Sequence, residues 1–333
     1  MTPDAEARPT DRPRNSDLAL VVLLGILWGS AFPVIRAGIV AGAPPLLFAS
    51  VRYLLTAAAL VPIALVARTP KPRRDVLLPP LLLGGVLMIG AYGALLYVGE
   101  ETTSGGLAAV LTASAPLASA TVGYRLLPAE RLGGFGVLGL LVGFGGVGVL
   151  VLPQLVTANG IGTVGPVLVV AAVLMFASGS VLLRRTSHVA PGFWLLSMQF
   201  AMGGVVTGAL GLLEGEPLTL GKGSVVGPAL AFLVVFTGIV GYTLYFRIHH
   251  SSGPTRANVV GYVNPVTGVL VGLILFAESV TAIEIAGMIL IGGGLFLLQR
   301  DRRPQPTPHD VPGPGSTTTK PLGSADSASP DHR

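Results

Sequence analysis

A few polar side chains interrupt long apolar runs in this sequence, and these are the side chains that could bind a polar ligand. Arg52 lies inside the apolar run 45–66, and Gln199 lies at the comparable place in a later run. Unpaired polarity in hydrocarbon is costly, so such side chains pair, bond to a neighbouring helix or line a polar cavity. Arg52 is predicted to snorkel or to pair with Glu100 or Glu101. The alternative is that it offers a fixed cation to a carboxylate.

Two asparagines lie in the ninth apolar run. Asn258 and Asn264 are six residues apart, which is about 240° around a helix, so they do not both face one narrow cavity. We predict that one of them lines a cavity and that the other bonds to a neighbouring helix.

Several candidate residues fall near the predicted bilayer midplane. They are Trp28 and Ser30, Phe176 and Ser178, Ser114 with Pro116, and Asn264 with Pro265. Because proline lacks an N–H, Pro116 frees the carbonyl of Thr112, and Pro265 acts likewise in its own helix. Both prolines are predicted hinges, the alternative being ordinary kinks that a neighbouring helix satisfies.

Tyrosines and glutamates cluster near the ends of the runs. Tyr92 and Tyr245, with Tyr97 and Tyr242, fall toward the mouths of a cavity, where tyrosine serves equally well as an aromatic anchor. Tyr92 and Tyr245 are predicted to contact the ligand.

Glu130 and Glu278 stand at the starts of the fifth and tenth runs, where the partial positive charge of a helix N-terminus favours a carboxylate. We predict that they are helix caps and not proton carriers. Glu284, one turn deeper, is the alternative acidic candidate.

Composition identifies the elements that hold these residues. Half of the 333 residues are hydrophobic (51%), only 11% are charged, against about 25% in soluble domains, and the mean hydropathy is +0.73. We predict an all-α membrane protein with ten transmembrane helices. The ten segments are 18–39, 45–66, 76–98, 104–125, 132–152, 165–184, 191–212, 225–247, 254–276 and 281–299.

The sequence repeats at a spacing of about 148 residues. The matching positions are Trp28-Gly29-Ser30 with Phe176-Ala177-Ser178, Ser50 with Ser197, Tyr97 with Tyr245, Pro116 with Pro265, Glu130 with Glu278, Gly139 with Gly287, and Gly146 with Gly294. Five helices per copy is an odd number, so the two copies are predicted to be inverted relative to one another. The predicted units are an N-terminal tail (1–17), two five-helix repeats (18–152 and 165–299) and a disordered tail (300–333).

Lysine and arginine set the orientation, because cytoplasmic loops carry the excess of both. With the N-terminus inside, the outer loops hold only Lys222, and every inner loop holds basic residues. Both termini are therefore predicted to be cytoplasmic. Arginine makes up 18 of the 21 basic residues, which hints at a GC-rich bacterial genome and so at a bacterial plasma (inner) membrane.

The same composition limits the partners. Basic residues lie in loops and tails and form no single face, so nucleic acid is not expected; the partners are lipid and a small-molecule substrate. The chain has no cysteine, and its five histidines lie in loops or tails, so neither a metal, a cofactor nor a catalytic residue is expected. Small-xxx-small pairs such as Gly139/Gly143 are compatible with a homodimer, although such pairs more often pack helices within one chain.

The repeats carry a resemblance to a known family. The run Leu24 to Phe32 followed by Arg52-Tyr53 resembles the opening of EamA-type members of the drug/metabolite transporter superfamily. The closing runs resemble that family too, namely Pro116, Ala129-Glu130-Arg131-Leu132, Gly139 and Gly146, with Pro265, Ala277-Glu278-Ser279-Val280, Gly287 and Gly294. The resemblance covers residues 18–299 and implies ten helices, an inverted repeat and secondary transport of small metabolites.

These observations together predict a secondary transporter that moves a small polar metabolite or amino acid outward by alternating access. The alternatives are multidrug or xenobiotic efflux, a channel and a receptor. An enzyme is not expected, because a membrane-embedded one needs clustered His, Asp or Glu. The two copies differ most at Arg52, which is matched by uncharged Gln199. Arg52 is therefore predicted to attract an anionic group, with Gln199 and Asn264 offering neutral hydrogen bonds.

Overall fold

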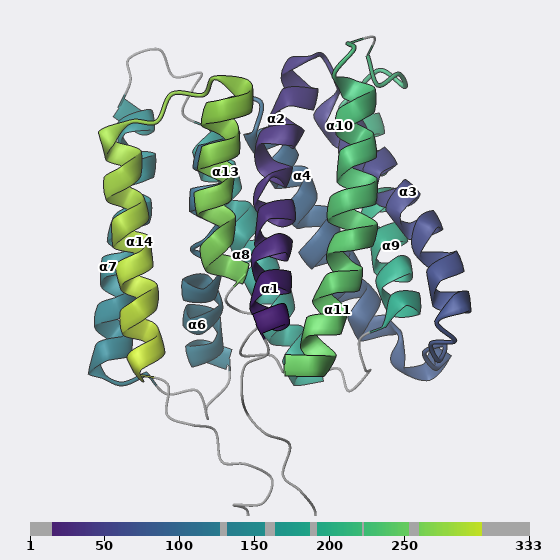
Figure 1. Ribbon diagram of the computed structural model, residues 1–333, viewed down its shortest axis with the longest axis horizontal. Helices are drawn as coiled ribbons and strands as arrows, with labels where there is room; N and C mark the ends of the chain where they lie inside the picture. The colour runs from purple at the N-terminus through teal and green to yellow at the C-terminus, as the bar shows by residue number, and fades with distance from the viewer. Residues whose placement is uncertain are drawn as a thin grey trace, which may run out of the picture. The chain divides into compact units, whose positions relative to one another are not determined.

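The computed structural model describes residues 15–126, 132–156, 164–186, 192–221, 223–252 and 260–301, and every regular element in these ranges is a helix (Figure 1). Nine of the described helices are long and apolar enough to span a membrane, and a tenth, Val260–Phe276, has 17 residues. They coincide with the ten predicted segments, except that 254–259 lies outside the described residues. Large apolar side chains such as Leu141 (68% exposed) and Ile274 (72%) face outward, as lipid contact requires. The chain is a multi-pass membrane protein.

The helices of the first half are α1 (Asn15–Gly29), α2 (Ala31–Val40), α3 (Pro45–Val66), η1 (Arg74–Val76), η2 (Pro80–Ala91), α4 (Tyr92–Gly99), α5 (Gly105–Thr112), α6 (Ala115–Leu126) and α7 (Gly134–Val156). Those of the second half are α8 (Val164–Thr186), α9 (Phe193–Leu213), α10 (Val226–Phe232), η3 (Leu233–Val240), α11 (Gly241–Ser252), α13 (Val260–Phe276) and α14 (Ala282–Asp301).

Two spans of the first half are interrupted for one or two residues near the middle, and these interruptions are called breaks below. The first span breaks at Ser30, between α1 and α2, because Pro33 has no N–H to bond to the carbonyl four residues earlier. The fourth breaks between α5 and α6, two residues before Pro116. Their counterparts in the second half, α8 and α13, are continuous helices, although α13 contains Pro265. Equivalent spans of the two copies therefore have different shapes.

Two other spans contain π-helix, in which hydrogen bonds join residues five apart. These segments are η2 in the third span and η3 in the eighth, its counterpart in the second copy. Single π-helical turns are rare and often lie at functional sites. One of them, η3, carries Thr237, which belongs to the site described below.

Helices α7 and α14 pack through matched glycines, side by side in Figure 1. A Cβ atom added to Gly139 would lie 2.6 Å from the carbonyl oxygen of Gly294, and one added to Gly146 would lie 2.9 Å from that of Gly287. Gly139 is equivalent to Gly287, and Gly146 to Gly294. Each position thus touches the equivalent of the other, which is the pairing that a two-fold axis between antiparallel helices produces.

Helices α3 and α9 repeat this arrangement with hydrogen bonds. The Ser50 hydroxyl donates to the carbonyl of Gly204 and the Ser197 hydroxyl to that of Ala57, each at 2.8 Å. Ser50 is equivalent to Ser197, and Ala57 to Gly204, at a spacing of 147. Because the axis crosses membrane-spanning helices at right angles, it lies in the membrane plane. Both helix pairs therefore support the predicted inversion of the repeats.

Candidate functional site

Arg52 occupies the centre of a polar and aromatic cluster inside the helix bundle. Its guanidinium donates one hydrogen bond to the Tyr97 hydroxyl on α4 (2.8 Å) and another to Thr237 Oγ1 on η3 (3.0 Å). Its Cζ atom also lies 5.5 Å from the centre of the Tyr53 ring, a cation–π contact. These contacts hold a permanent cation in the interior.

The ring system around Arg52 joins five helices. Tyr53 packs edge-on against Tyr97, with 65° between the ring planes, and also against Phe200 of α9. On the other side, Trp28 of α1 packs against Tyr242 and Tyr245 of α11, with ring centres 5.3 and 5.7 Å away. Aromatic pairs at these separations stabilise one another beyond their buried area, so the ring contacts help to hold these helices together.

Thr237 connects the two sides of the cluster. Its backbone carbonyl accepts a hydrogen bond from Trp28 Nε1 (3.1 Å), and its hydroxyl accepts the one from Arg52. The same hydroxyl donates to the carbonyl of Leu233 (2.6 Å) within η3. Trp28 and Arg52 come from the first repeat and Thr237 from the second, so the cluster, named here the Arg52 cluster, lies between the repeats.

No carboxylate neutralises Arg52 in the part of the chain that the structure describes. The one ion pair there joins Arg73 to Asp75 at the surface. Pairing of Arg52 with Glu100 or Glu101, one of the predicted alternatives, is therefore not what the structure shows. The cation is held by neutral hydroxyls and rings.

Three predicted ligand contacts, Trp28, Arg52 and Tyr245, come together in this cluster. A fourth, Tyr92, packs against Phe176 of α8 (5.7 Å between ring centres) and lies close enough to Arg52 to interact with it electrostatically.

The remaining predicted residues lie in other surroundings. Ser30 and Ser114 are buried at the two helix breaks, where their hydroxyls donate to the carbonyls of Ile26 and Leu111, each at 2.6 Å. Ser178 is half-buried on α8, a helix that packs against α6 and η2. Ser30 and Ser114 therefore bond within their own spans, and Ser178 lies on a helix that packs against its neighbours.

The amide side chains bond to neighbouring helices. Gln199 Nε2 donates to the carbonyl of Pro80 at the start of η2 (3.1 Å). With its nitrogen turned toward the carbonyls, Asn264 donates to Gly25 of α1 (3.1 Å) and to Val260 of its own helix (3.0 Å). Asn264 thus has the helix-bonding role predicted for one of the two asparagines, while Asn258 lies outside the described residues.

The two predicted hinge prolines have different environments. Pro116 is exposed in the first turn of α6, directly after the break. Pro265 is buried inside α13. The structure places both at or near the middle of their spans, and whether they act as hinges stays a prediction.

Sequence reasoning missed part of this site. Thr237 was not singled out, and Tyr97 and Tyr242 were placed at the cavity mouths, whereas Tyr97 is fully buried beside Arg52. The usable signal was the hydroxyl of Thr237, the single polar side chain between Val225 and Gly241. Its distance of 185 residues from Arg52 in sequence hid the contact.

Glu278 does cap a helix, but the prediction that it caps its own helix is wrong. Its carboxylate accepts hydrogen bonds from the backbone N–H groups of Gly105 (2.8 Å) and Gly106 (2.9 Å), so it caps α5 of the other repeat. The N-cap of α14 is Thr281, whose Oγ1 accepts from the N–H of Glu284 (3.2 Å), while the Glu284 carboxylate accepts from Thr281 N (2.9 Å) to complete a capping box. Helix α14 begins at Ala282, too far from Glu278 for that residue to cap it. Glu130 lies outside the described residues.

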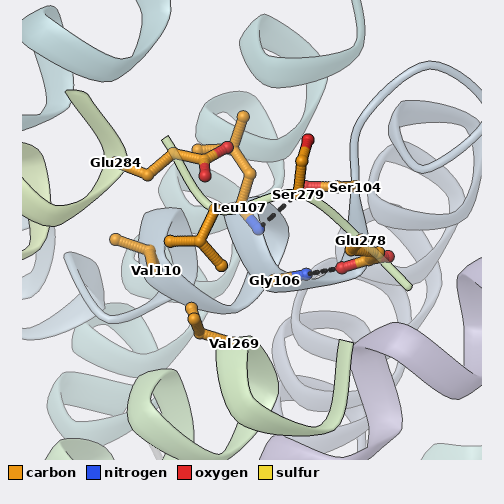
Figure 2. Close-up of a pocket in the computed structure, with 9 residues that line it drawn as sticks. Ser104, Gly106, Leu107, Val110, Val269, Glu278, Ser279 and Glu284 are labelled. Atoms are coloured by element: carbon orange, nitrogen blue, oxygen red, sulfur yellow. Dashed lines mark hydrogen bonds between the residues drawn. The ribbon is translucent and has the colours of Figure 1, made fainter. Parts of the chain in front are cut away.

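Figure 2 shows the small cavity at this cap, with Glu278 on one side and Glu284 on the other. Its volume of about 10 Å³ is room for roughly one water molecule, too little for a metabolite. The cavity is therefore a small gap in the packing where Glu278 caps α5, and it is not a substrate site.

Known proteins resemble the chain along its length. The model of the EamA-like transporter family matches residues 16–152 and 163–300. The chain is 25% identical over 297 residues to the "Uncharacterized transporter YvbV" of Bacillus subtilis, which covers 88% of this chain and 94% of that protein. It is 28% identical over 261 residues to the "Uncharacterized inner membrane transporter YedA" of Escherichia coli, with coverages of 78% and 83%.

Two further likenesses concern function and fold. A "Probable amino-acid metabolite efflux pump" of Salmonella typhimurium is 25% identical over 297 residues, covering 85% of this chain and 94% of that protein. A solved crystal structure superposes with a TM-score of 0.59 at 21% identity, covering 87% of this chain and all of the other. The latter likeness supports the fold.

Proposed function

Because the chain belongs to the EamA-like transporter family, we propose that it is a secondary transporter that exports a small metabolite bearing a carboxylate, such as an amino acid, across the plasma membrane. Transport proceeds by alternating access, and the substrate binds at the Arg52 cluster between the repeats. Transporter sites commonly lie near the midplane at such a repeat interface.

The observation that carries this proposal is the half-buried guanidinium of Arg52, which lies within the bundle and forms no ion pair among the described residues. A charge largely withdrawn from water without a counterion is costly, and two hydroxyls and a ring compensate only part of that cost. A substrate carboxylate supplies the missing negative charge, and the planar donor fork of arginine matches its two oxygens. The surrounding rings suit the apolar part of a metabolite.

The difference in shape between equivalent spans supports alternation. The first and fourth spans are broken, whereas their counterparts α8 and α13 are continuous. In an inverted repeat, exchanging the two shapes between the copies exchanges the open side of the molecule. The efflux pump among the relatives supports an amino-acid metabolite as the cargo and export as the direction.

The test is counterflow in proteoliposomes, after a comparison of metabolite pools in cells with and without the protein has supplied candidate substrates. Saturable exchange of a carboxylate metabolite, with weak exchange of its neutral amide, is the expected result. Equal transport of acid and amide would refute the role of Arg52, and flux without saturation or counterflow would favour a channel.

The main competing function is efflux of drugs. The aromatic cluster suits apolar compounds, but Arg52 repels the organic cations that many such pumps export. Inhibition of counterflow by cationic drugs at low concentration would favour this alternative.

A further inference from the structure

Glu100 is a buried carboxyl group without a hydrogen-bond partner, at the end of α4. It is fully buried, and neither of its side-chain oxygens has a partner among the described residues. Thr103 beside it is also buried, and its hydroxyl is unpartnered too. Buried polar groups nearly always have a partner, so two exceptions at one place need an explanation. In the sequence, Glu100 falls in the short connection between the predicted spans 76–98 and 104–125, which the predicted orientation puts outside.

The charges around Glu100 oppose one another. Burial is the largest effect and raises the pKa of Glu100 well above its ordinary value, and the carboxylate of Glu278 raises it further. Arg36 on α2 and Arg52 on α3 lower it, but Arg36 donates its hydrogen bonds to the backbone carbonyls of Glu100 and Glu101. The C-terminal end of α4 also disfavours a negative charge. The other titratable groups that face Glu100 are the hydroxyls of Tyr53, Tyr92 and Tyr97.

This end of the bundle is closed in the structure. Helix α2 packs so tightly on the start of α5 that a Cβ atom on Gly105 would lie 2.5 Å from the nitrogen of Pro33. Glu278 bridges from the α13–α14 connection to the same point, where the remaining cavity is about 10 Å³ (Figure 2). Glu100 is therefore shut off from water only while this end stays closed.

We propose that Glu100 is a proton-binding site that controls the closure of this end, taking up a proton when the end closes and releasing it when the end opens to water. The inference rests on the proposed alternating access. Because the closed state binds the additional proton, acidity favours closure and alkalinity favours opening. The predicted topology puts this end outside, so the site senses external pH.

Single cysteines test the proposal, since the chain has none of its own. Thr103→Cys reports opening, because residue 103 is buried, and Thr102→Cys, at the exposed neighbouring position, reports the pH dependence of thiol chemistry alone. Both are labelled with a membrane-impermeant maleimide from about pH 5.5 to about pH 8.5. The rate at residue 103 divided by that at residue 102 is expected to rise with pH, by at most about tenfold per pH unit for one linked proton.

In the Glu100→Gln background, which mimics the protonated acid, the ratio is expected to stay low and flat, whereas Glu101→Gln should leave the rise intact. A flat ratio with Glu100 present, or an unchanged rise in Glu100→Gln, overturns the proposal. If Glu100→Gln does not accumulate, infrared spectra of the parent protein at about pH 7 take the place of the labelling of that variant. A protonated carboxyl band supports the site and its absence overturns it.

Neither measurement needs a substrate. A chain that fails to transport carboxylates can therefore still confirm the proton site. Conversely, a flat labelling ratio in a protein that transports carboxylates would overturn the proton site and leave the proposed function intact.

Discussion

At the scale of single residues, the proposed function assigns to Arg52 the recognition of a negatively charged group on the substrate. Replacing it with glutamine, the residue at the equivalent place in the second repeat, removes the charge and keeps a hydrogen-bonding side chain. Losing a charge-assisted hydrogen bond costs about 1.5–3 kcal/mol, so we expect apparent affinity for the carboxylate substrate to fall roughly 10- to 100-fold. Counterflow measured at matched membrane abundance checks this. Arg73→Gln, at an exposed arginine, is the control. Unchanged affinity in Arg52→Gln would reduce Arg52 to a scaffold residue.

Glu278 is expected to matter for stability and not as a proton carrier. In Glu278→Gln one of the two N–H groups of Gly105 and Gly106 faces an NH₂ group and loses its acceptor, at a cost of about 0.5–2 kcal/mol. Thermal unfolding in detergent should show a lower midpoint. Glu284→Gln is the matched control, because glutamine also completes a capping box. Loss of pH-driven transport in Glu278→Gln at normal abundance and stability would contradict this view.

The site was predictable where a residue type was unusual for its surroundings. Arg52 of α3 and Trp28 of α1 stand out in their apolar helices, and both form hydrogen bonds with Thr237. The roles of Thr237 and Glu278 were not predictable, since their partners lie 185 and 172 residues away and only tertiary packing brings them together. Glu100 is buried although it follows α4 directly, and Arg36 of α2, 64 residues away in sequence, donates to its backbone carbonyl, which no local pattern reveals.

At the scale of helices, apolar length alone predicted the spans, because a membrane imposes a minimum number of apolar residues on each. A hydropathy pattern does not predict the helix breaks or the π-helical segments, because these depend on individual residues and their backbone hydrogen bonds. Pro33 is an example: it lies three residues after the break at Ser30 and was overlooked in a run that otherwise favours a continuous helix.

The contact between α7 and α14 gives a sharp prediction at this scale. A Cβ atom at Gly294 would lie 2.5 Å from the Gly139 carbonyl oxygen and 2.6 Å from Gly143 Cα, and these are backbone atoms that cannot rotate away. We expect Gly294→Ala to destabilise the protein by about 1–3 kcal/mol through overpacking. Gly293→Ala, in the same helix with open space around it, should be neutral or stabilising by about 0.5–1 kcal/mol. Thermal unfolding of both variants checks this, and equal midpoints would mean that the helices pack differently.

At the scale of the whole molecule, the reciprocal contacts connect the repeat to the mechanism. Ser50 and Ser197 make equivalent hydrogen bonds across α3 and α9, and α7 and α14 pair their glycines in the same reciprocal manner. These two helix pairs obey two-fold symmetry, whereas the first and fourth spans depart from it. We infer that the symmetric pairs form the frame and that the broken spans move against it, with the Arg52 cluster between them.

The orientation of this frame in the membrane can be tested. An inverted repeat requires consecutive loops to alternate sides, and the basic residues predict cytoplasmic termini with the loop 213–224 outside. Thr219 is exposed in that loop, so Thr219→Cys in this cysteine-free chain reports its side directly. A membrane-impermeant maleimide should label it in intact cells, while a cysteine at exposed Arg185, at the predicted inner end of α8, should react only after the membrane is opened. The opposite pattern would invert the topology and put the Glu100 end in the cytoplasm, where its proton would come from inside. Labelling of both sites in intact cells would mean that 185 and 219 share a side, and that result would contradict the single crossing by α9 on which the inverted repeat depends.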